Sequence, residues 1–163
     1  MNPPSFTIRA YSRADSQHCT HCFISNVPRF FSRDEIAEYK EWLDKLEKDL
    51  TGSIAAVAGT HYYVISNHEQ IVGCGGFGLK DNKREVVFAW GLIDQQFHKQ
   101  GYGKALFEYR LTEAGFIYPG MDILLDTSQH SFTSFQKYGF KVEKVTPDFY
   151  APGMDRYDMR YSP

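Results

Sequence analysis

The sequence lacks a long hydrophobic run and carries no large excess of charge of either sign. No uninterrupted apolar stretch approaches the ~20 residues that a membrane-spanning helix needs, so we expect no membrane partner. The 18 Lys and Arg residues and the 20 Asp and Glu residues leave a net charge of -2. Because this balance gives no general attraction to polyanions, we also expect no nucleic-acid partner.

Cysteine is scarce as well. The chain has three cysteines, an odd number that fits reduced thiols better than a disulfide framework. Residues 1–9 lack the basic stretch and apolar core of a secretory leader. Both features predict a cytoplasmic location. Two histidines and two cysteines gather at residues 18–22, but no second ligand pair follows them, so no metal site is predicted.

The sequence does have enough apolar material for a folded core. Of its 163 residues, 42% are hydrophobic and 16% are aromatic, which argues against disorder. The length suits one domain spanning residues 1–163 rather than two. We see no internal repeat and no low-complexity tract. These observations favour a single-domain α/β protein.

Hydrophobic periodicity predicts strands and helices in alternation along the chain. Residues 34–48 have the most regular helical pattern, and Ser32 and Glu35 form a capping box in front of them. The other predicted helices are 16–24, 101–117 and 131–138. The predicted strands are 6–11, 62–66, 70–79, 85–93, 123–126, 140–145 and 156–161, with loops at 51–60 and around 147–153.

The order of these elements predicts a mixed sheet. Short turns join the three strands between residues 62 and 93, which predicts an antiparallel meander. The strand 85–93, the helix 101–117 and the strand 123–126 form a crossover, so the two strands should be parallel. The glycines at 73–78 fall inside a strand and predict a bulge, or a close approach of a cofactor or a neighbouring backbone.

A glycine-bearing turn at residues 98–104 leads from strand to helix. Such a turn leaves N–H groups unpaired at the positive end of the helix dipole, which suits phosphate. A P-loop would need glycine at position 98 and Ser or Thr at 105, but the chain has His98 and Ala105. A dinucleotide fingerprint would need a third glycine where Leu106 stands. The remaining pattern, Gln/Arg-x-x-Gly-x-Gly/Ala, matches residues 98–103 except at its first position.

This pattern resembles the acetyl-CoA site of the GCN5-related N-acetyltransferases, the GNAT superfamily. A second match lies at residues 126–140, where a short helix ends in an aromatic-x-x-x-Gly-Phe signature built from Phe135, Gly139 and Phe140. The element order matches the family over nearly the whole chain. The resemblance implies the α/β (α+β) GNAT fold, a mixed and mostly antiparallel sheet with a splayed parallel pair, flanked by helices.

The resemblance also implies acetyl-CoA as co-substrate and a place for it. In the family the pantetheine arm lies between the splayed strands, and the loop glycines let the pyrophosphate approach the backbone. The residues implied to bind the cofactor are Leu92, Ile93, His98, Lys99, Gln100, Gly101, Tyr102, Gly103, Lys104, Ser128 and Phe135.

The implied reaction is direct attack of a neutral amine on the acetyl carbonyl, so a base must deprotonate an amine of pKa near ~10. Glu85 is the carboxylate on the strand that borders the site, although it also fits a solvent-facing charge. His130, at the mouth of the splayed strands, fits a base, an acid, a cofactor contact or an ordinary helix-start residue. Phe135 replaces the tyrosine that often serves as the family's acid, which puts that proton donor in doubt.

The acceptor is implied to lie against the segment that precedes the helix 34–48. Arg29 or Arg33 would pair with a substrate carboxylate, or else is a surface arginine. Phe30 and Phe31 would form an apolar wall, and Tyr150 would reach the acceptor from the last loop. The expected acceptor is a primary amine of a small molecule or a peptide, and the protein is expected to be a monomer or a homodimer. Two other functions stay open: a GNAT-fold acyl-CoA-binding module with weak or lost catalysis, and a nucleotide-binding protein.

Overall fold

A computed structural model describes residues 5–50 and 60–163, so the loop predicted at 51–60 lies almost entirely outside the described residues. The elements follow the predicted order. The helices are α1 Ser16–Ser25, α2 Asp34–Leu50, α3 Tyr102–Ile117 and α4 Phe132–Gln136, with 3₁₀ turns at Arg13–Asp15 and Gln95–Phe97. The strands are β1 Thr7–Ala10, β2 His61–Asn67, β3 Gln70–Leu79, β4 Glu85–Ile93, β5 Asp122–Thr127, β6 Lys141–Ala151 and β7 Met154–Tyr161.

The closing strands are longer than predicted, and the long loop expected between them is wrong. β6 runs through Pro147 to Ala151, and only Pro152 and Gly153 separate it from β7. Proline is tolerated because β6 is the edge strand and its pairing with β7 is irregular between Thr146 and Ala151. Gly153 has a φ of 77°, which glycine adopts without strain and which the tight turn requires.

The seven strands form one mixed sheet in the order β1-β2-β3-β4-β5-β7-β6. Every neighbouring pair is antiparallel except β4 and β5, which are parallel because α3 crosses over between them. The predicted meander and the predicted parallel pair are therefore both confirmed.

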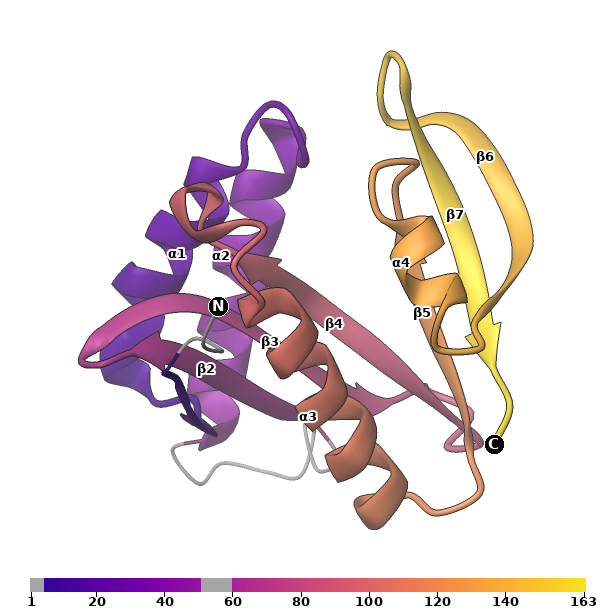
Figure 1. Cartoon of the computed structure of the whole chain (residues 1–163), viewed down its shortest axis with the longest axis horizontal. Coiled ribbons are helices and arrows are strands. Elements are labelled where there is room, and N and C mark those ends of the chain that lie inside the picture. The colour runs from indigo at the N-terminus through magenta and orange to yellow at the C-terminus, as the bar shows by residue number, and fades with distance from the viewer. Residues whose placement is uncertain (1–4, 51–59) are drawn as a thin grey trace.

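Two apolar clusters pack on opposite faces of the sheet. On one face, α1 and α2 pack on β2, β3 and β4 through a cluster that includes Phe23, Tyr39 and Leu92. On the other face, α3 covers β3 and β4 through residues such as Phe88 and Phe107. Figure 1 shows α3 on the side of β3 and β4 that faces away from α1 and α2.

The parallel pair is short and then opens. β4 and β5 pair only from Glu85 to Val87 and from Asp122 to Leu124. Beyond this point β4 continues to Ile93 without β5 beside it, while β5 stays paired with β7. Figure 1 shows the two strands meeting at their starts and separating along their length. The backbone of β4 beyond Val87 therefore has an unpaired edge.

The predicted irregularity in the glycine-rich strand is present. Trp90 and Gly91 of β4 together oppose the single residue Gly75 of β3, which makes a β-bulge. We call Trp90 and Gly91 the β4 bulge. A close approach of backbone also occurs, since a Cβ on Gly76 would lie 2.0 Å from the carbonyl oxygen of His61.

Candidate cofactor and acceptor site

The start of α3 presents backbone donors that have no helical partner. Gly101 is the N-cap with a φ of 94°, and no side chain among the described residues caps the helix. The first backbone bond into the helix runs from Ala105 N–H to the Gly101 carbonyl. The N–H groups of Tyr102, Gly103 and Lys104 therefore remain available at the positive end of the dipole. This end of α3 is suited to hold phosphate.

Gly103 is not required by the packing of the protein itself. Of the part of the chain that the structure describes, a Cβ at this position would meet, beyond α3 itself, only the Ile93 Cγ1, at an ordinary contact distance of 3.6 Å. Because the residue is exposed on the first turn of α3, its missing side chain leaves the helix N-terminus open to a ligand. Lys99 and Lys104 are exposed beside this opening and add positive charge.

The residues before Gly101 tie the turn to the end of β4. His98 Nε2 donates to the carbonyl of Ile93 at 2.8 Å, and Asn26 Nδ2 donates to the same oxygen at 2.8 Å. Gln100 donates to the Gln96 carbonyl. Since a carbonyl has two lone pairs, the Ile93 oxygen is fully occupied. His98 thus has a structural contact that the sequence did not predict.

The N–H of Ile93 faces the open edge of β4. The N–H of Asp94 donates to the Val72 carbonyl of β3, so the backbone groups of Asp94 point toward β3. Backbone groups of successive residues in a strand point in opposite directions, so those of Ile93 point toward the open edge. β5 does not pair with β4 at this level. Of the two backbone positions expected to bind the cofactor, Ile93 therefore offers a donor to the space between the strands, while Leu92 pairs with Cys74 of β3.

Phe30 links the two sides of the open edge. Its ring lies 5.1 Å from the ring of His98, beyond the end of β4, and 5.5 Å from that of His130, beyond the end of β5. Arg29 places its guanidinium 5.2 Å from the same ring. Phe31 instead stacks on buried Phe23 at 4.5 Å. Phe30 and Arg29 thus border the site, whereas Phe31 anchors the segment in the core.

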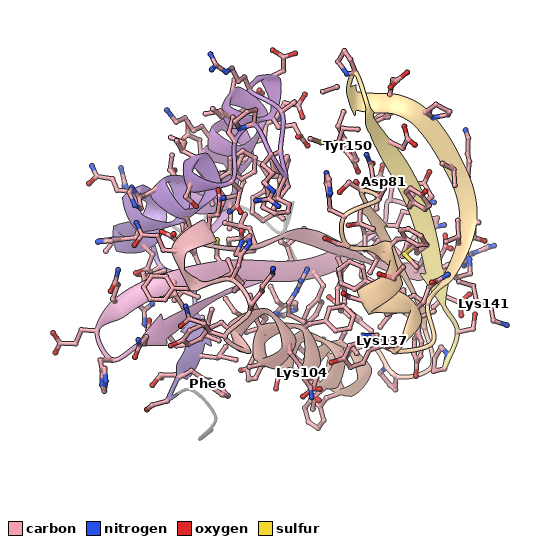
Figure 2. All side chains as sticks on the ribbon, turned by 45° about the horizontal axis from the view of Figure 1, so that its top comes forward. Phe6, Asp81, Lys104, Lys137, Lys141 and Tyr150 are labelled. Carbon is pink, nitrogen blue, oxygen red and sulfur yellow. The ribbon has the colours of Figure 1, made fainter. Side chains whose placement is uncertain are left out.

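Tyr150 reaches β5 from the β6–β7 hairpin. Its hydroxyl donates to Asp126 Oδ2, and Arg156 Nη2 lies 3.8 Å from the other oxygen of that carboxylate. Burial first, and then the Asp126 charge, raise the pKa of Tyr150. Gln129 holds the hairpin in place through bonds to Gly153 and Asp155. Figure 2 shows Tyr150 on the side of the hairpin that faces the helices α1 and α2.

Glu35 is a buried carboxylate that the sequence indicated only as a helix cap. Its Oε2 accepts the N–H of Ser32 at 2.8 Å, which confirms the capping contact. The residue is 8% exposed, and no arginine or lysine among the described residues pairs with it. Burial is the main cause that raises its pKa, the charge of Glu38 on the same helix adds to the rise, and the charge of Asp126 adds a smaller part. The charge of Glu35 is also the smallest of the causes that act on the pKa of Tyr150, so Glu35 lies within electrostatic reach of Tyr150 and Asp126.

Ser128, His130 and Phe135 shape the turn into α4. Ser128 is buried, and its Oγ accepts the N–H of His130 at 3.3 Å. His130 itself is exposed. Phe135 packs on Phe107 of α3 with ring centroids 5.0 Å apart, and no hydroxyl occupies its position. Tyr138 packs on the same ring of Phe107, and its hydroxyl donates to Glu108 Oε1 at 2.9 Å.

The structure separates Glu85 from His130, the other predicted catalytic residue. Glu85 begins β4, about 26 Å along the strand from Ile93 at the usual rise per residue. Its carboxylate pairs with Arg160 at 2.6 Å, and Arg160 also pairs with Asp122 at 2.8 Å. The Asn82 amide, followed by Arg160, lowers the pKa of Glu85. Glu85 thus ties together the starts of β4 and β5.

Replacing Glu85 by Gln is expected to leave acetyl transfer within about twofold of wild type while lowering the melting temperature. The pKa of Glu85 is lower in the folded chain than its ordinary value of 4.5. Its contribution to stability is therefore present above about pH 4.5 and is lost as the pH falls through the folded pKa. Melting curves at neutral and acid pH should show the difference between the two proteins shrinking at acid pH. If the melting temperatures of wild type and Glu85→Gln differ by the same amount at both pH values, the stabilising role of the Glu85 charge is contradicted.

Two further features bear on partners. Among residues 5–50 and 60–163, no group of three or more His, Cys, Asp or Glu side chains is arranged to hold a metal ion. In the same part of the chain, no helix is long and apolar enough to span a membrane.

Comparison with known proteins identifies the family. A family model described as an acetyltransferase (GNAT) domain matches residues 28–163, which is most of the chain. The chain belongs to the GNAT acetyltransferase family. The predicted resemblance is confirmed, and the family model supports an acyltransferase.

Solved structures of GNAT proteins share the fold at low sequence identity. An acetyltransferase of the GNAT family from Desulfovibrio desulfuricans has a TM-score of 0.77 at 19% identity, over 97% of this chain and 99% of that one. The ribosomal-protein-S18-alanine N-acetyltransferase from Escherichia coli has a TM-score of 0.71 at 14% identity, over 97% and 94%. An aminoglycoside 6'-N-acetyltransferase complexed with coenzyme A has a TM-score of 0.69 at 14% identity, over 96% of both chains. No curated protein matches this GNAT chain by sequence.

Proposed function

We propose that this GNAT acetyltransferase transfers an acetyl group from acetyl-CoA to a primary amine of a small molecule or a peptide. The observation that carries the proposal is the open start of α3 beside the unpaired edge of β4. The start of α3 offers N–H donors for a pyrophosphate, and the adjacent edge of β4 offers backbone donors for an extended polar arm. A structural neighbour solved with coenzyme A supports this choice of cofactor.

The proposed cofactor contacts follow from the available donors. The N–H groups of residues 101–104 would hold the pyrophosphate, with Lys99 and Lys104 nearby. The N–H of Ile93 would bond the pantetheine arm, while its carbonyl already has two donors. His98 would act mainly by holding the turn against β4. The thioester end would then lie toward Phe30, between the ends of the two strands.

The proposed acceptor end is the group formed by Glu35, Asp126 and Tyr150. A protonated amine must lose a proton before it attacks, and a carboxylate with a raised pKa is a suitable base. Glu35 meets this requirement because burial raises its pKa and no basic side chain among the described residues neutralises it. We therefore assign the base to Glu35. His130 remains the alternative, since its exposed ring lies against Phe30.

The proposed reaction conserves atoms and charge. Glu35 takes one proton from the ammonium form, and the neutral amine nitrogen then forms a bond to the acetyl carbon. The bond from that carbon to sulfur breaks, and the second proton that the nitrogen loses passes to water. The sulfur leaves as a thiolate, which is fairly stable with a thiol pKa of ~8.5. This chemistry does not require an acid at the position of Phe135. Tyr150 keeps its proton at neutral pH and would be a hydrogen-bond donor at this end of the site.

A binding module without efficient catalysis is the second candidate, because Phe135 places a ring against Phe107 where the family often has a hydroxyl. The two candidates share the cofactor site and differ in turnover. The module should bind acetyl-CoA and give no acetylated product with any amine. The enzyme should bind acetyl-CoA and acetylate at least one member of an amine panel.

Side-by-side calorimetric titration with acetyl-CoA, CoA, ATP and NAD tests the cofactor. We expect acetyl-CoA and CoA to bind, and ATP and NAD to bind at least about tenfold more weakly, because neither carries a pantetheine arm. An assay of free thiol release with small and peptide amines then tests transfer. Preference for ATP or NAD over acetyl-CoA would refute the proposal and favour a nucleotide-binding protein.

A further inference from the structure

The β4 bulge lies just beyond the point at which β4 leaves β5. The parallel pairing ends at Val87, and the bulge follows at Trp90 and Gly91. Trp90 has a φ of 41°, a backbone conformation that is uncommon for a bulky side chain. Such a conformation persists only when surrounding contacts enforce it. Two contacts of this kind are present, one on each face of the sheet.

Arg110 holds the bulge from the α3 face. Its guanidinium donates from Nε and Nη2 to the Gly76 carbonyl, at 3.1 and 2.7 Å, and from Nη2 to the Ala89 carbonyl at 3.3 Å. The same group lies 4.3 Å from the centre of the Phe88 ring. Arg110 thus joins β3 to β4 directly beside the bulge.

The sequence leaves room for this arginine. A Cβ on Gly91 would lie 2.4 Å from Arg110 Nη1, and a Cβ on Gly75 would lie 3.2 Å from its Cζ. Gly91 therefore leaves the space that the guanidinium occupies where it crosses the sheet, and Gly75 allows a close fit beside it. Gly75 thus accounts for part of the glycine-rich pattern of β3.

Arg110 is buried without an acidic partner. It is 6% exposed, and no carboxylate among the described residues pairs with it. Burial lowers its pKa to about 10, so the side chain keeps its charge at neutral pH. A charge that is buried and bound only to carbonyl groups is unfavourable for folding compared with an apolar side chain of similar size. Its contacts with Gly76 and Ala89 suggest a role in shaping β4.

Tyr62 holds the bulge from the α1 and α2 face. Its hydroxyl donates to the carbonyl of Trp90 at 2.8 Å. The hydroxyl of Tyr39 lies 2.9 Å from that of Tyr62 and 3.2 Å from Cys74 Sγ. Tyr39 and Tyr62 are both buried, so this short network fixes the carbonyl of Trp90 inside the core.

We propose that Arg110 and Tyr62 are positioning residues that hold the β4 bulge in the shape required to bind the pantetheine arm of acetyl-CoA. This inference rests on the proposed function. The two side chains fix neighbouring carbonyls, those of Ala89 and Trp90, and so set the direction in which β4 leaves β5. The edge between Val87 and Ile93 then presents its donors at the correct angle to the arm. Neither side chain is expected to influence the pyrophosphate site at α3.

The test compares two ligands that differ in the pantetheine arm. Acetyl-CoA contains the arm, and 3'-phospho-ADP has the pyrophosphate without it. In Arg110→Met and Tyr62→Phe, we expect the dissociation constant for acetyl-CoA to rise about tenfold to a hundredfold, since small displacements of a binding group have effects of this size. The dissociation constant for 3'-phospho-ADP should change less than about twofold. If Arg110 and Tyr62 were purely structural, their replacement would lower the melting temperature and leave the ratio of the two dissociation constants unchanged.

Tyr63→Phe is the matched control, because it removes the same atom from the next residue of β2. Tyr63 lies on the opposite face of β2, where its ring packs against Phe77 and Tyr109, and among the described residues no hydrogen bond or ring contact joins its side chain to Trp90. Its acetyl-CoA affinity should equal that of wild type. If Arg110→Met does not fold, Arg110→Lys replaces it, since lysine keeps the charge but cannot bridge the two carbonyls as a fork.

The outcomes separate this inference from the proposed function. If wild type binds acetyl-CoA and the Arg110 and Tyr62 variants retain its selectivity over 3'-phospho-ADP, the inference is overturned and the proposed function stands. If wild type binds 3'-phospho-ADP and acetyl-CoA equally well, the arm contributes nothing and the inference is also overturned. If wild type binds neither ligand, the proposed function fails and the inference fails with it.

Discussion

Replacing Gly103 by Glu is expected to raise the dissociation constant for acetyl-CoA at least about a hundredfold without unfolding the chain. The new side chain would project into the opening at the start of α3, where the pyrophosphate is proposed to bind. Two like charges about 4 Å apart near a protein surface repel each other by ~4 kcal/mol. A hundredfold loss needs only ~2.7 kcal/mol, so the repulsion alone accounts for it.

The fold should tolerate this change. Among the described residues, apart from the chain neighbours and the backbone of α3 itself, the only atom within 4 Å of the Cβ is Ile93 Cγ1 at 3.6 Å, and Gly103 is exposed. In a helix, glycine is also less favourable than glutamate by a few tenths of a kcal/mol or more, so stability should be equal or higher. Calorimetric titration measures the binding, and thermal melting measures the fold.

Gly115→Glu provides the matched control. It introduces the same charge into the same helix, near the opposite end, where nothing lies within 4 Å of the added Cβ. We expect its affinity for acetyl-CoA to equal that of wild type. Equal affinity in the Gly103 variant as well would show that the cofactor does not use the start of α3.

Replacing Glu35 by Gln is expected to lower kcat about a hundredfold to ten-thousandfold, the usual range for loss of a general base. Glutamine keeps a carbonyl oxygen that accepts the Ser32 N–H, so the start of α2 should remain capped. Acetyl-CoA affinity should stay within about twofold, because Glu35 lies on the acceptor side. Steady-state kinetics with the best amine of the panel, together with calorimetry, would separate these effects.

The pH profile gives a second measurement of the same role. Burial raises the pKa of Glu35 above its ordinary value of 4.5, and a base acts only when it is deprotonated. The activity of wild type should therefore fall as the pH is lowered through that raised pKa. In Glu35→Gln this acid limb should disappear, and only the limb set by the acceptor amine should remain.

Glu41→Gln is the control for a surface carboxylate on the same helix. Glu41 is exposed and pairs with Lys45 at 3.4 Å, so its loss should change neither kcat nor the pH profile. A wild-type acid limb that persists in Glu35→Gln and vanishes in His130→Gln would transfer the role of base to His130. No turnover by wild type with any amine would favour the binding module instead.

Most of the fold was predictable from local patterns. The periodicity of α2, the turns between β2, β3 and β4, and the strand–helix–strand order around α3 lie within short segments, and each depends on neighbours in sequence. The same holds for the open start of α3, since Gly101 and Gly103 stand next to the helix that they leave uncapped. The error at β6 arose because a proline is compatible with an edge strand, and edge position is a property of the whole sheet.

The acceptor side was far less predictable. Glu85 and Glu35 look alike in sequence as carboxylates at the starts of elements, yet one pairs with Arg160 and the other is buried near Asp126. Phe30 and Phe31 are adjacent, but only Phe30 lies between the two histidines. Which residues become neighbours depends on the placement of α2 and the β6–β7 hairpin, whose nearest ends, Leu50 and Lys141, are 91 residues apart along the chain.

The sequence by itself determined the order of elements, the parallel pair and the glycine turn that opens α3, because each depends on a local pattern of glycine, charge and apolar spacing. Only the tertiary structure decided which carboxylate is buried without a basic partner, which aromatic ring borders the site, and that Arg110 crosses beneath Gly75 and Gly91. Burial and charge pairing arise from segments distant in sequence, so no local pattern specifies them.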